Sequence, residues 1–256
     1  MKVLVVIPTY NEVQALEPIV SRVRTSVPDA DILVVDDDSP DGTGDLADRI
    51  AVDDGTVHVL HRAGKEGLGK AYLAAFDWAM GRDYTHVVQM DADGSHRPEE
   101  LPLLLERAGM SDYPDLIIGS RYVRGGEMVG WPKSREILSR AGNFYIKAWL
   151  GIPASDVTAG YRVYRTGFLR RIDFTSVESS GYFFQTDMTD KVHQLGGSII
   201  EMPINFAQRE VGESKLSASI FAESFSRATK MGVKRRARQV AALGRSAANR
   251  LRRRPS

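Results

Sequence analysis

Short apolar runs and helical patterns alternate along the first 120 residues, and this alternation limits the possible fold more than any other feature. The apolar runs are rich in Val, Ile and Leu and are strand-length: "KVLVVIP", "DILVVD", "VHVLH", "HVVQM" and "DLIIGS". Helical patterns separate them at residues 13–25, 43–52 and 70–80, and another helix begins near Pro98. Strands that are apolar throughout and separated by helices are typical of a parallel sheet covered on both faces. We therefore predict an α/β fold with a mostly parallel central sheet and helices on both faces.

The pattern changes after Ser120. Residues 121–136 are rich in glycine and charge, which predicts a loop, and residues 137–150 have the spacing of an amphipathic helix. "GYRVYR" and "SIIEMPINF" predict two later strands, with a helix at 181–195 between them. We find no internal repeat and no low-complexity linker, so the simplest division is one domain at residues 1–215, whose last strand ends near Phe206, and an appendage at 216–256.

The appendage combines an amphipathic pattern with a basic tail. Residues 216–231 place Ile220, Phe221, Phe225 and Ala228 at helical spacing. The net charge of +1 divides into +10 for residues 230–256, which contain no acidic residue, and −9 for the remainder. A basic amphipathic segment suits an anionic membrane surface, where each basic residue contributes on the order of 1 kcal/mol. Docking on an integral membrane partner and a packed helix with a solubilising tail remain open. The acidic body argues against a nucleic-acid partner.

Composition narrows the other classes of protein. The chain has no cysteine, which excludes disulfides and Cys-based zinc sites and permits a cytosolic location. Pro8 and polar residues interrupt the first apolar stretch, so it is predicted as a strand and not a signal peptide. No apolar run approaches the roughly 18 residues of a membrane span, so no transmembrane helix is expected.

Carboxylates follow three of the first four strands. The stretches are "PTYNE", "DDDSPDGT" and "DADGSH", and the last contains Asp91 and Asp93. In open α/β sheets ligands bind beyond the carboxyl ends of the strands, and clustered carboxylates need a cation or hydrogen-bond donors nearby. Oxygen ligands without Cys favour Mg²⁺ or Mn²⁺, which commonly bind one or two carboxylates together with substrate phosphates. A nucleoside-diphosphate substrate is therefore indicated, although an isolated D-x-D triplet is also common in turns.

Candidate anion-binding residues lie elsewhere. The glycine-rich stretch "AGKEGLGKA" at residues 63–71 suggests phosphate binding, but Ala71 stands where a P-loop needs a hydroxyl, and no G-x-G-x-x-G follows the first strand. Guanidinium and ammonium groups suited to phosphate occur downstream, although each alone is more often a surface charge: Arg121, Arg135, Arg209 and Lys215.

Seven stretches of this sequence come in the order and spacing of a known family. They are "VVIPTYNE", "VVDDDSPDGT", "GLGKAY", "MDADGSH", "IIGSRY", "SDVTAGYRVYR" and "REVGESKL". Over roughly residues 1–220 the chain resembles the dolichyl- or polyprenyl-phosphate mannosyltransferases of glycosyltransferase family 2. The resemblance implies a GT-A fold and inverting transfer of mannose from GDP-mannose to a polyprenyl phosphate, with Mg²⁺ or Mn²⁺ as cofactor. It also implies a peripheral enzyme on the cytoplasmic face of a membrane.

The resemblance also implies roles for particular residues. Those expected to line the nucleotide pocket are Pro8, Tyr10, Glu12, Val35 and Asp37. Asp91, Ala92 and Asp93 would bind the diphosphate and the metal, with the two aspartates as metal ligands. Arg121 and Arg135 would hold the acceptor phosphate, and Arg209 with Lys215 would close over the donor pyrophosphate. The set expected to act in catalysis is Asp93, Arg121, Arg135, Arg209 and Lys215.

The sequence departs from the family pattern at a few positions. Gly94 and Ser95 follow the D-x-D where longer side chains are usual, and Asp38 stands where Gly, Asn or Ser is common. A phosphate acceptor is already anionic near neutral pH, because its second pKa is about 6, so Asp187 is assigned only an orienting role. Two alternatives remain: a UDP-glucose-dependent polyprenyl-phosphate glucosyltransferase, and a non-catalytic nucleotide-binding scaffold at the membrane.

Overall fold

The computed structural model describes residues 1–256 except 178–180, 182, 208–224, 235 and 237–256. The first half alternates strands with helices: β1 (Val3–Thr9), α1 (Val13–Ser26), β2 (Asp31–Asp36), α2 (Thr43–Asp53), β3 (Val57–His61), α3 (Leu68–Met80), β4 (His86–Gln89), the 3-10 turn η1 (Pro98–Glu100), α4 (Leu101–Ala108) and β5 (Leu116–Ser120). The second half follows as β6 (Glu127–Met128), α5 (Lys133–Leu150), β7 (Arg162–Arg165), α6 (Thr166–Leu169), η2 (Phe174–Ser176), α7 (Phe184–Gln194), β8 (Ile199–Pro203) and β9 (Asn205–Phe206).

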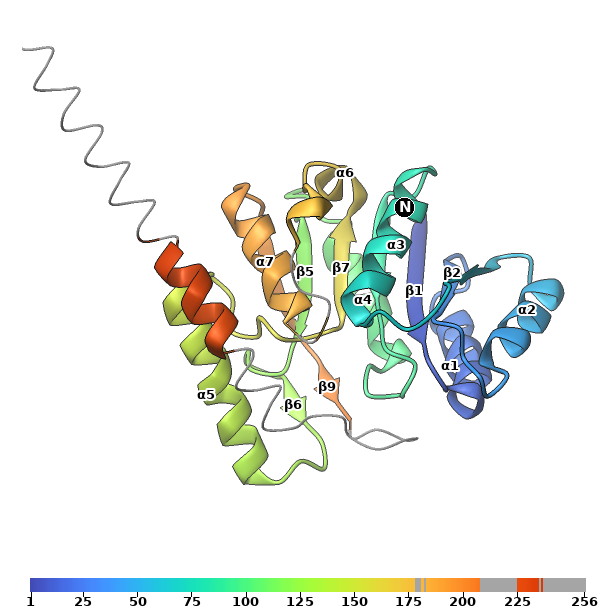
Figure 1. The fold of residues 1–256 in the computed structure, drawn as a ribbon, viewed down its shortest axis with the longest axis horizontal. Helices are drawn as coiled ribbons and strands as arrows, with labels where there is room; N and C mark the ends of the chain where they lie inside the picture. Colours follow the sequence, from blue (N-terminus) through green and yellow to red (C-terminus); the bar gives the residue numbers. More distant parts are fainter. Residues whose placement is uncertain (178–180, 182, 208–224, 235, 237–256) are drawn as a thin grey trace, which may run out of the picture.

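Seven strands form the central sheet, in the order β3-β2-β1-β4-β7-β5-β8 (Figure 1). All neighbouring pairs are parallel except those of β7, which runs antiparallel to β4 and β5. The predicted α/β fold with a mostly parallel sheet is therefore confirmed. Thr9 pairs with Asp36 in register, and β4 lies on the other side of β1, so the carboxyl ends of these three strands meet at one edge.

Alternate residues of each strand enter the cores on opposite faces of the sheet, which explains the uninterrupted apolar runs. In β1, Leu4 and Val6 pack in a core with α3, α5 and α7, whereas Val5 and Ile7 pack in a second core with α1, α2 and α4. Because both faces are covered, the strands need apolar residues at every position. The same packing holds their carboxyl ends in place.

The region after Ser120 contains more structure than predicted. The segment predicted as a loop includes β6, which pairs with β9 in a separate two-stranded sheet. Helix α5 begins at Lys133, four residues before the predicted start, because Pro132 accepts the first helical hydrogen bonds from the N–H groups of Arg135 and Glu136. The predicted strand "SIIEMPINF" is divided into β8 and β9, so the chain leaves the main sheet after Pro203.

Residues 225–234 are helical and lie beside α5 (Figure 1). Ala228 is completely buried, and the rings of Phe225 and Tyr145 are 4.6 Å apart. These two residues of the predicted amphipathic segment therefore pack against the domain, as in the alternative of a packed helix. Ile220, Phe221 and most of the basic tail lie outside the described residues.

Candidate active site

A cavity of about 270 Å³ opens at the carboxyl ends of β1, β2 and β4. Its lining comes from the end of β1, the loops after β1, β2, β3 and β4, the start of α3 and the segment before α7: Pro8, Thr9, Tyr10, Glu12, Asp37, Lys65, Gly67, Leu68, Ala71, Asp91, Ala92, Asp93 and Gly181. The cavity therefore lies at the sheet edge where α/β folds bind ligands. The structure brings together Pro8, Tyr10, Glu12 and Asp37 with the D-x-D triplet, as the resemblance implies. Val35 instead lies in the core with no exposed surface, so its side chain does not line the cavity.

The loops after β1 and β2 are held to each other by side-chain hydrogen bonds. Asp36 accepts hydrogen bonds from the hydroxyl groups of Thr9 (3.0 Å) and Ser39 (2.6 Å). Thr43 Oγ1 accepts from the backbone N–H of Glu12, and Asp41 Oδ2 accepts from the N–H of Val13. Asp36 and Asp41 of "DDDSPDGT" therefore accept hydrogen bonds that join the two loops, which is one of the two ways expected for clustered carboxylates to be satisfied.

Two residues in these loops have left-handed backbone conformations. Asn11 has φ 58° and Asp38 has φ 57°. Asn and Asp tolerate this region better than most residues with a Cβ. The positive φ of Asp38 is a conformation that Gly and Asn, both common at this position in the family pattern, also adopt readily.

Asp37 is a buried carboxylate of the cavity wall. It is 5% exposed and bonded to Arg62, whose second Nη lies 2.6 Å from Glu66. Burial raises the pKa of Asp37 above its ordinary 3.8, although the hydrogen bond and charge of Arg62 oppose the shift. Lys65, from the glycine-rich stretch, lies with its Nζ 3.9 Å from the centre of the Tyr10 ring. The cavity thus has a cation beside an aromatic wall.

The D-x-D loop is shaped by a buried histidine. His96 is 2% exposed, and its Nδ1 accepts a hydrogen bond from the backbone N–H of Asp91 at 3.0 Å. An accepting Nδ1 places the ring proton on Nε2 in the neutral form. The ring stacks on Tyr161, with centroids 5.1 Å apart, and its edge is close to Gly160, where a Cβ would lie 3.0 Å from Cε1. His96 therefore fixes the backbone from which Asp91 projects.

The two aspartates of the triplet have different surroundings. Asp93 is buried and accepts the N–H of Ser95 at 3.0 Å, and Gly94 between them has φ 77°. The Asp91 side chain is 32% exposed, and the hydroxyl of Tyr72 lies 3.5 Å from its Oδ1. Burial, together with the nearby Asp91 charge, raises the pKa of Tyr72 well above its usual value, so the phenol stays protonated.

These residues fit a divalent cation that is also held by substrate. Asp91 and Asp93 are carboxylates on one cavity wall, and among the described residues no three His, Asp or Glu side chains gather as a closed metal cage. Two carboxylates with open positions suit Mg²⁺ or Mn²⁺, which complete their coordination with phosphate oxygens and water. Asp91 and Asp93 are therefore the residues that would hold the cation.

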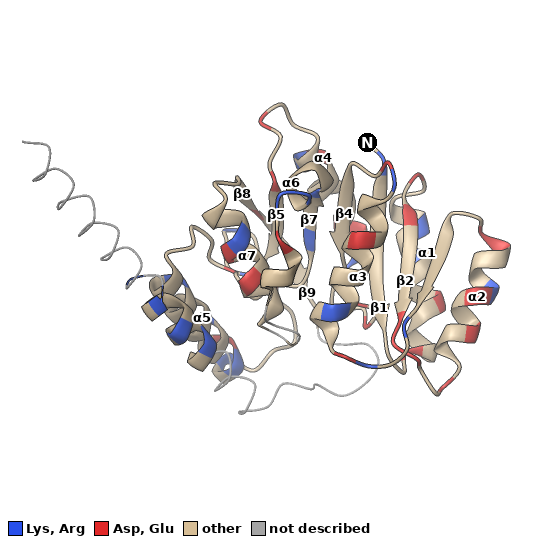
Figure 2. Cartoon of the chain, turned by 45° about the horizontal axis from the view of Figure 1, so that its top comes forward, with Lys and Arg blue, Asp and Glu red and all other residues tan. Residues whose placement is uncertain are grey.

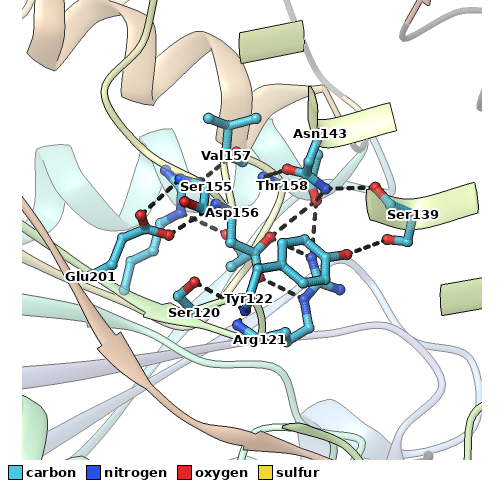
Figure 3. A network of polar contacts seen from close by, with 12 residues as sticks. Ser120, Arg121, Tyr122, Ser139, Asn143, Ser155, Asp156, Val157, Thr158 and Glu201 are labelled. Carbon is cyan, nitrogen blue, oxygen red and sulfur yellow. Dashed lines mark hydrogen bonds and ion pairs between the residues drawn. The ribbon is translucent and has the colours of Figure 1, made fainter. Parts of the chain in front are cut away.

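Arg121, predicted as a ligand of the acceptor phosphate, forms a buried ion pair with Asp156. It is 7% exposed, and its Nε and Nη2 donate to Asp156 at 2.7 and 2.6 Å (Figure 3). Asp156 is fully buried and also accepts the backbone N–H of Arg121. Glu201 of β8 accepts hydrogen bonds from the N–H groups of Ser155 and Asp156, which fixes the position of this loop. Arg121 is therefore held in place by a buried carboxylate, and its role as a ligand of the acceptor phosphate stays a prediction.

Arg135 lies at the start of α5, where its guanidinium stacks 3.8 Å from the Trp131 ring centre. Aromatic contacts connect this group to the D-x-D loop, because Phe206 meets Trp131 at 5.8 Å and His96 at 5.5 Å. A series of ring contacts thus runs from Arg135 through Trp131 and Phe206 to His96, and the role of Arg135 toward the acceptor phosphate stays a prediction. Arg209 and Lys215 lie outside the described residues.

Sequence reasoning missed several contributors to the site. Lys65 belongs to a stretch that was considered for phosphate binding only as a P-loop, and its contact with Tyr10 comes from the fold. His96 follows the D-x-D by three residues, so its proximity was a usable signal. Asp187, predicted to orient the reaction, is 4% exposed in the first turn of α7 and is not part of the cavity lining.

Comparison with known proteins supports this geometry. Residues 4–173 match the family model for glycosyl transferase family 2. The chain is 53% identical to an undecaprenyl-phosphate mannosyltransferase of Micrococcus luteus, over 91% of this chain and 95% of that protein. It is 50% identical to a polyprenol monophosphomannose synthase of Mycolicibacterium smegmatis, over 92% of this chain and 88% of that protein.

Solved structures show the same fold at low sequence identity. A Mycobacterium tuberculosis glucosyl-3-phosphoglycerate synthase with Mn²⁺, UDP-glucose and phosphoglyceric acid has a TM-score of 0.64 at 18% identity, covering 90% of this chain and 79% of that one. A Pyrobaculum calidifontis mannosyltransferase with GDP-Man and Mn²⁺ has a TM-score of 0.57 at 18% identity, covering 98% and 80%. The predicted GT-A fold is confirmed, and the chain is a glycosyltransferase that belongs to family 2.

Proposed function

We propose that this chain transfers mannose from GDP-mannose to a polyprenyl phosphate, with inversion at the anomeric carbon and with a divalent cation. The observation that carries the proposal is the near end-to-end identity of 53% with a protein named as an undecaprenyl-phosphate mannosyltransferase. The cavity at the strand ends, with Asp91 and Asp93 on its wall, supports the same activity. The Mn²⁺ and GDP-Man in a solved mannosyltransferase of the same fold are consistent with this donor and cofactor.

The donor occupies the cavity in this proposal. Tyr10, Glu12 and Asp37 contact the nucleoside, and Lys65 lies beside them as a cation for the nucleotide. Asp91 and Asp93 would hold a divalent cation beside the diphosphate. When bound, a divalent cation neutralises charge that develops on the leaving diphosphate. Arg209 and Lys215 are assigned to the same leaving group from the family motif alone.

The acceptor approaches from the side of Arg135. An acceptor-phosphate oxygen attacks the anomeric carbon as the bond from that carbon to the diphosphate oxygen breaks, and GDP departs with the bonding electrons. A phosphomonoester is largely dianionic above its second pKa of about 6, so no proton has to be removed from the nucleophile. The protein's contribution is to align the acceptor phosphate with the anomeric carbon and to neutralise the negative charge of the two phosphate groups.

A lipid acceptor places the enzyme at a membrane surface. No helix in the part of the chain that the structure describes is long and apolar enough to cross a bilayer. We propose a peripheral enzyme on the cytoplasmic face, which acts with or without an integral membrane partner. Full turnover by the purified chain on lipid vesicles would remove the need for that partner.

The test is transfer of radiolabelled sugar into organic-extractable lipid. Purified protein is incubated with polyprenyl phosphate and either GDP-mannose or UDP-glucose, in the presence of Mg²⁺, Mn²⁺ or EDTA. The proposal predicts label from GDP-mannose only, and none with EDTA. Label from UDP-glucose alone would retain the acceptor and overturn the donor. Transfer that persists in EDTA would overturn the role of the metal.

A further inference from the structure

Strand β9 joins parts of the molecule that are far apart in the sequence. It lies outside the main sheet and pairs with β6, where Phe206 is opposite Met128 (Figure 1). The backbone N–H of Val129 donates to the carbonyl of Phe206 at 2.9 Å. This pairing ties β9 to the segment that leads into α5.

The residues on either side of Phe206 are bonded to the D-x-D loop and to η1. The backbone N–H of Ala207 donates to the carbonyl of Ser95 at 3.2 Å. Glu100 Oε1 accepts hydrogen bonds from the backbone N–H of Asn205 at 2.9 Å and from its side-chain amide at 2.8 Å. Because Ser95 follows the D-x-D triplet by two residues, β9 is bonded directly to the loop that carries the predicted metal ligands.

The ring of Phe206 contacts a side chain from each of these parts. Its centroid lies 5.5 Å from that of His96 and 5.8 Å from that of Trp131, at interplanar angles of 66° and 83°. Edge-to-face contacts at these distances are favourable for aromatic pairs. The guanidinium of Arg121 lies 5.3 Å from the same ring, within the range of a cation–π interaction. One ring therefore meets the D-x-D loop, the segment before α5 and the end of β5.

Both aromatic neighbours of Phe206 hold a residue that was assigned to the reaction. His96 accepts the backbone N–H of Asp91, and the Trp131 ring stacks on the guanidinium of Arg135 at 3.8 Å. Phe206 itself is partly buried against the core that contains α1, α2 and α4, and it is not among the described residues that line the cavity. Its influence on the reaction therefore passes through these neighbours.

The parts that β9 joins carry opposite charges. In Figure 2, Lys and Arg gather on α5 and Asp and Glu gather near β1 and β2, with β9 between them. Positive charge attracts an acceptor phosphate, and carboxylates attract a divalent cation. Transfer between two bound groups requires them to be held at a fixed separation, so a rigid link between these parts serves the reaction.

We propose that Phe206 is a positioning residue, whose ring holds Trp131, and with it Arg135, at a fixed separation from the D-x-D loop. The inference rests on the proposed function, because Arg135 is assigned there to the acceptor phosphate. A misplacement of about 1 Å far from the reacting atoms can lower a rate about a hundredfold. A leucine at position 206 would retain apolar volume but could not make the two edge-to-face contacts.

The first test is transfer of mannose to a short, water-soluble prenyl phosphate, which removes membrane binding from the comparison. Phe206→Leu should lower kcat/KM for this acceptor about tenfold or more, and should leave the affinity for GDP without metal unchanged. The double variant with Trp131→Leu should be no worse than Trp131→Leu alone, because both substitutions break the same contact. The matched control is Phe225→Leu, whose ring meets Tyr145 instead. It should transfer as the parent does, and its unfolding midpoint in urea should match that of Phe206→Leu.

A second measurement tests the geometry without relying on transfer. Mn²⁺ bound together with GDP broadens the NMR signals of nearby groups, by an amount that falls steeply with their distance from the ion. The indole N–H signal of Trp131 is assigned by its loss in Trp131→Phe. Its broadening should differ between Phe206→Leu and the parent, whereas the broadening of the Trp78 and Trp149 signals should be the same in both proteins.

Three results would overturn the role of Phe206: parent-like kcat/KM for Phe206→Leu, additive losses in the double variant, or equal broadening of the Trp131 signal in both proteins. A loss of metal-free GDP affinity as large as the loss of activity would indicate general loosening and would also overturn it. Failure of the parent to transfer mannose would overturn the proposed function, and the Mn²⁺ measurement would then decide the role of Phe206 by itself.

Discussion

This molecule contains two buried Arg–Asp pairs, Arg62–Asp37 and Arg121–Asp156, and the two pairs have different surroundings. Arg62 and Asp37 meet on the wall of an open cavity, where Asp37 faces the space a ligand would fill. Arg121 and Asp156 meet beneath the surface, and Asp156 has no exposed area. The sequence motif alone therefore does not show where an arginine lies. Its position depends on the carboxylate with which it pairs in the fold.

The largest expected effect comes from breaking the Arg121–Asp156 pair. Asp156→Ala leaves the Arg121 charge buried without its partner, which typically costs about 3–5 kcal/mol. The free energy of unfolding, measured by urea titration, should fall by that amount. Asp112→Ala is the control, because it breaks an exposed pair with Arg107 and should leave the unfolding midpoint nearly unchanged. An unchanged unfolding midpoint for Asp156→Ala would contradict the stabilising role of this pair.

Substitution of Asp93 on the cavity wall should lower the rate of mannosyl transfer and leave the free energy of unfolding nearly unchanged. Asp93→Asn removes a charged metal ligand, and mannosyl transfer with saturating Mn²⁺ should fall at least about a hundredfold. Asp83→Asn, at an exposed carboxylate paired with Lys2, is the matched control and should retain activity. Parent-like turnover and metal dependence of Asp93→Asn would remove Asp93 from the site.

A smaller effect is expected from His96, which supports the backbone of Asp91. His96→Ala removes the acceptor for the Asp91 N–H, and outer-shell changes of this kind typically cost about 10- to 100-fold in metal affinity or activity. Titration of Mn²⁺ against the GDP-bound protein should show the loss, whereas the affinity for GDP without metal should stay near that of the parent. His61→Ala, at an exposed histidine, serves as the control. Equal losses with and without metal would indicate general unfolding of the loop.

The smallest effect is a difference in pH dependence between two carboxylates of the β2 loop. Burial raises the pKa of Asp37, so the folded state binds its proton more tightly than the unfolded state, and this group makes stability fall as pH rises above 3.8. For Asp41, burial acts upward, but hydrogen bonds from Thr43 and Val13 outweigh it and lower the pKa. Its contribution is present above pH 3.8 and is lost as pH falls.

Asp37→Asn and Asp41→Asn should therefore change the slope of stability against pH in opposite directions. Urea unfolding between pH 3 and 6 measures both slopes. The Asp37 variant should lose the decline above pH 3.8, and the Asp41 variant should lose part of the fall at acid pH. Slopes that change in the same direction would contradict this assignment of the two environments.

The same contrast explains what the sequence could predict. Strand and helix periodicity predicted the sheet and the edge at which Asp91 and Asp93 lie, because both follow from local patterns. The direction of β7 was not predictable, since it depends on the connection through α5. The partnership of Arg121 with Asp156 joins residues 35 positions apart, and Glu201 stabilises it from another strand. Val35 was carried over from the family motif, but alternation along β2 places its side chain in the core.

The amphipathic segments show a similar limit. The pattern around Phe225 and Ala228 left a membrane-facing helix, a partner-binding helix and a helix packed on the domain open, and these two side chains pack in the structure, Phe225 against Tyr145 of α5. Helix α5 was predicted as an ordinary amphipathic helix, and only the fold shows that Ile137 and Phe144 point outward. Periodicity identifies an apolar face, and the neighbouring elements decide what covers it.

The most direct test of this account is the anomeric configuration of the product. Mannolipid made from GDP-α-mannose and a polyprenyl phosphate with Mn²⁺ can be examined by NMR for the configuration at the anomeric carbon. A single displacement by the acceptor phosphate predicts a β-linked mannosyl phosphate. An α-linked product would contradict direct displacement, and the absence of any mannolipid from an active-site-intact, folded enzyme would contradict the proposed reaction itself.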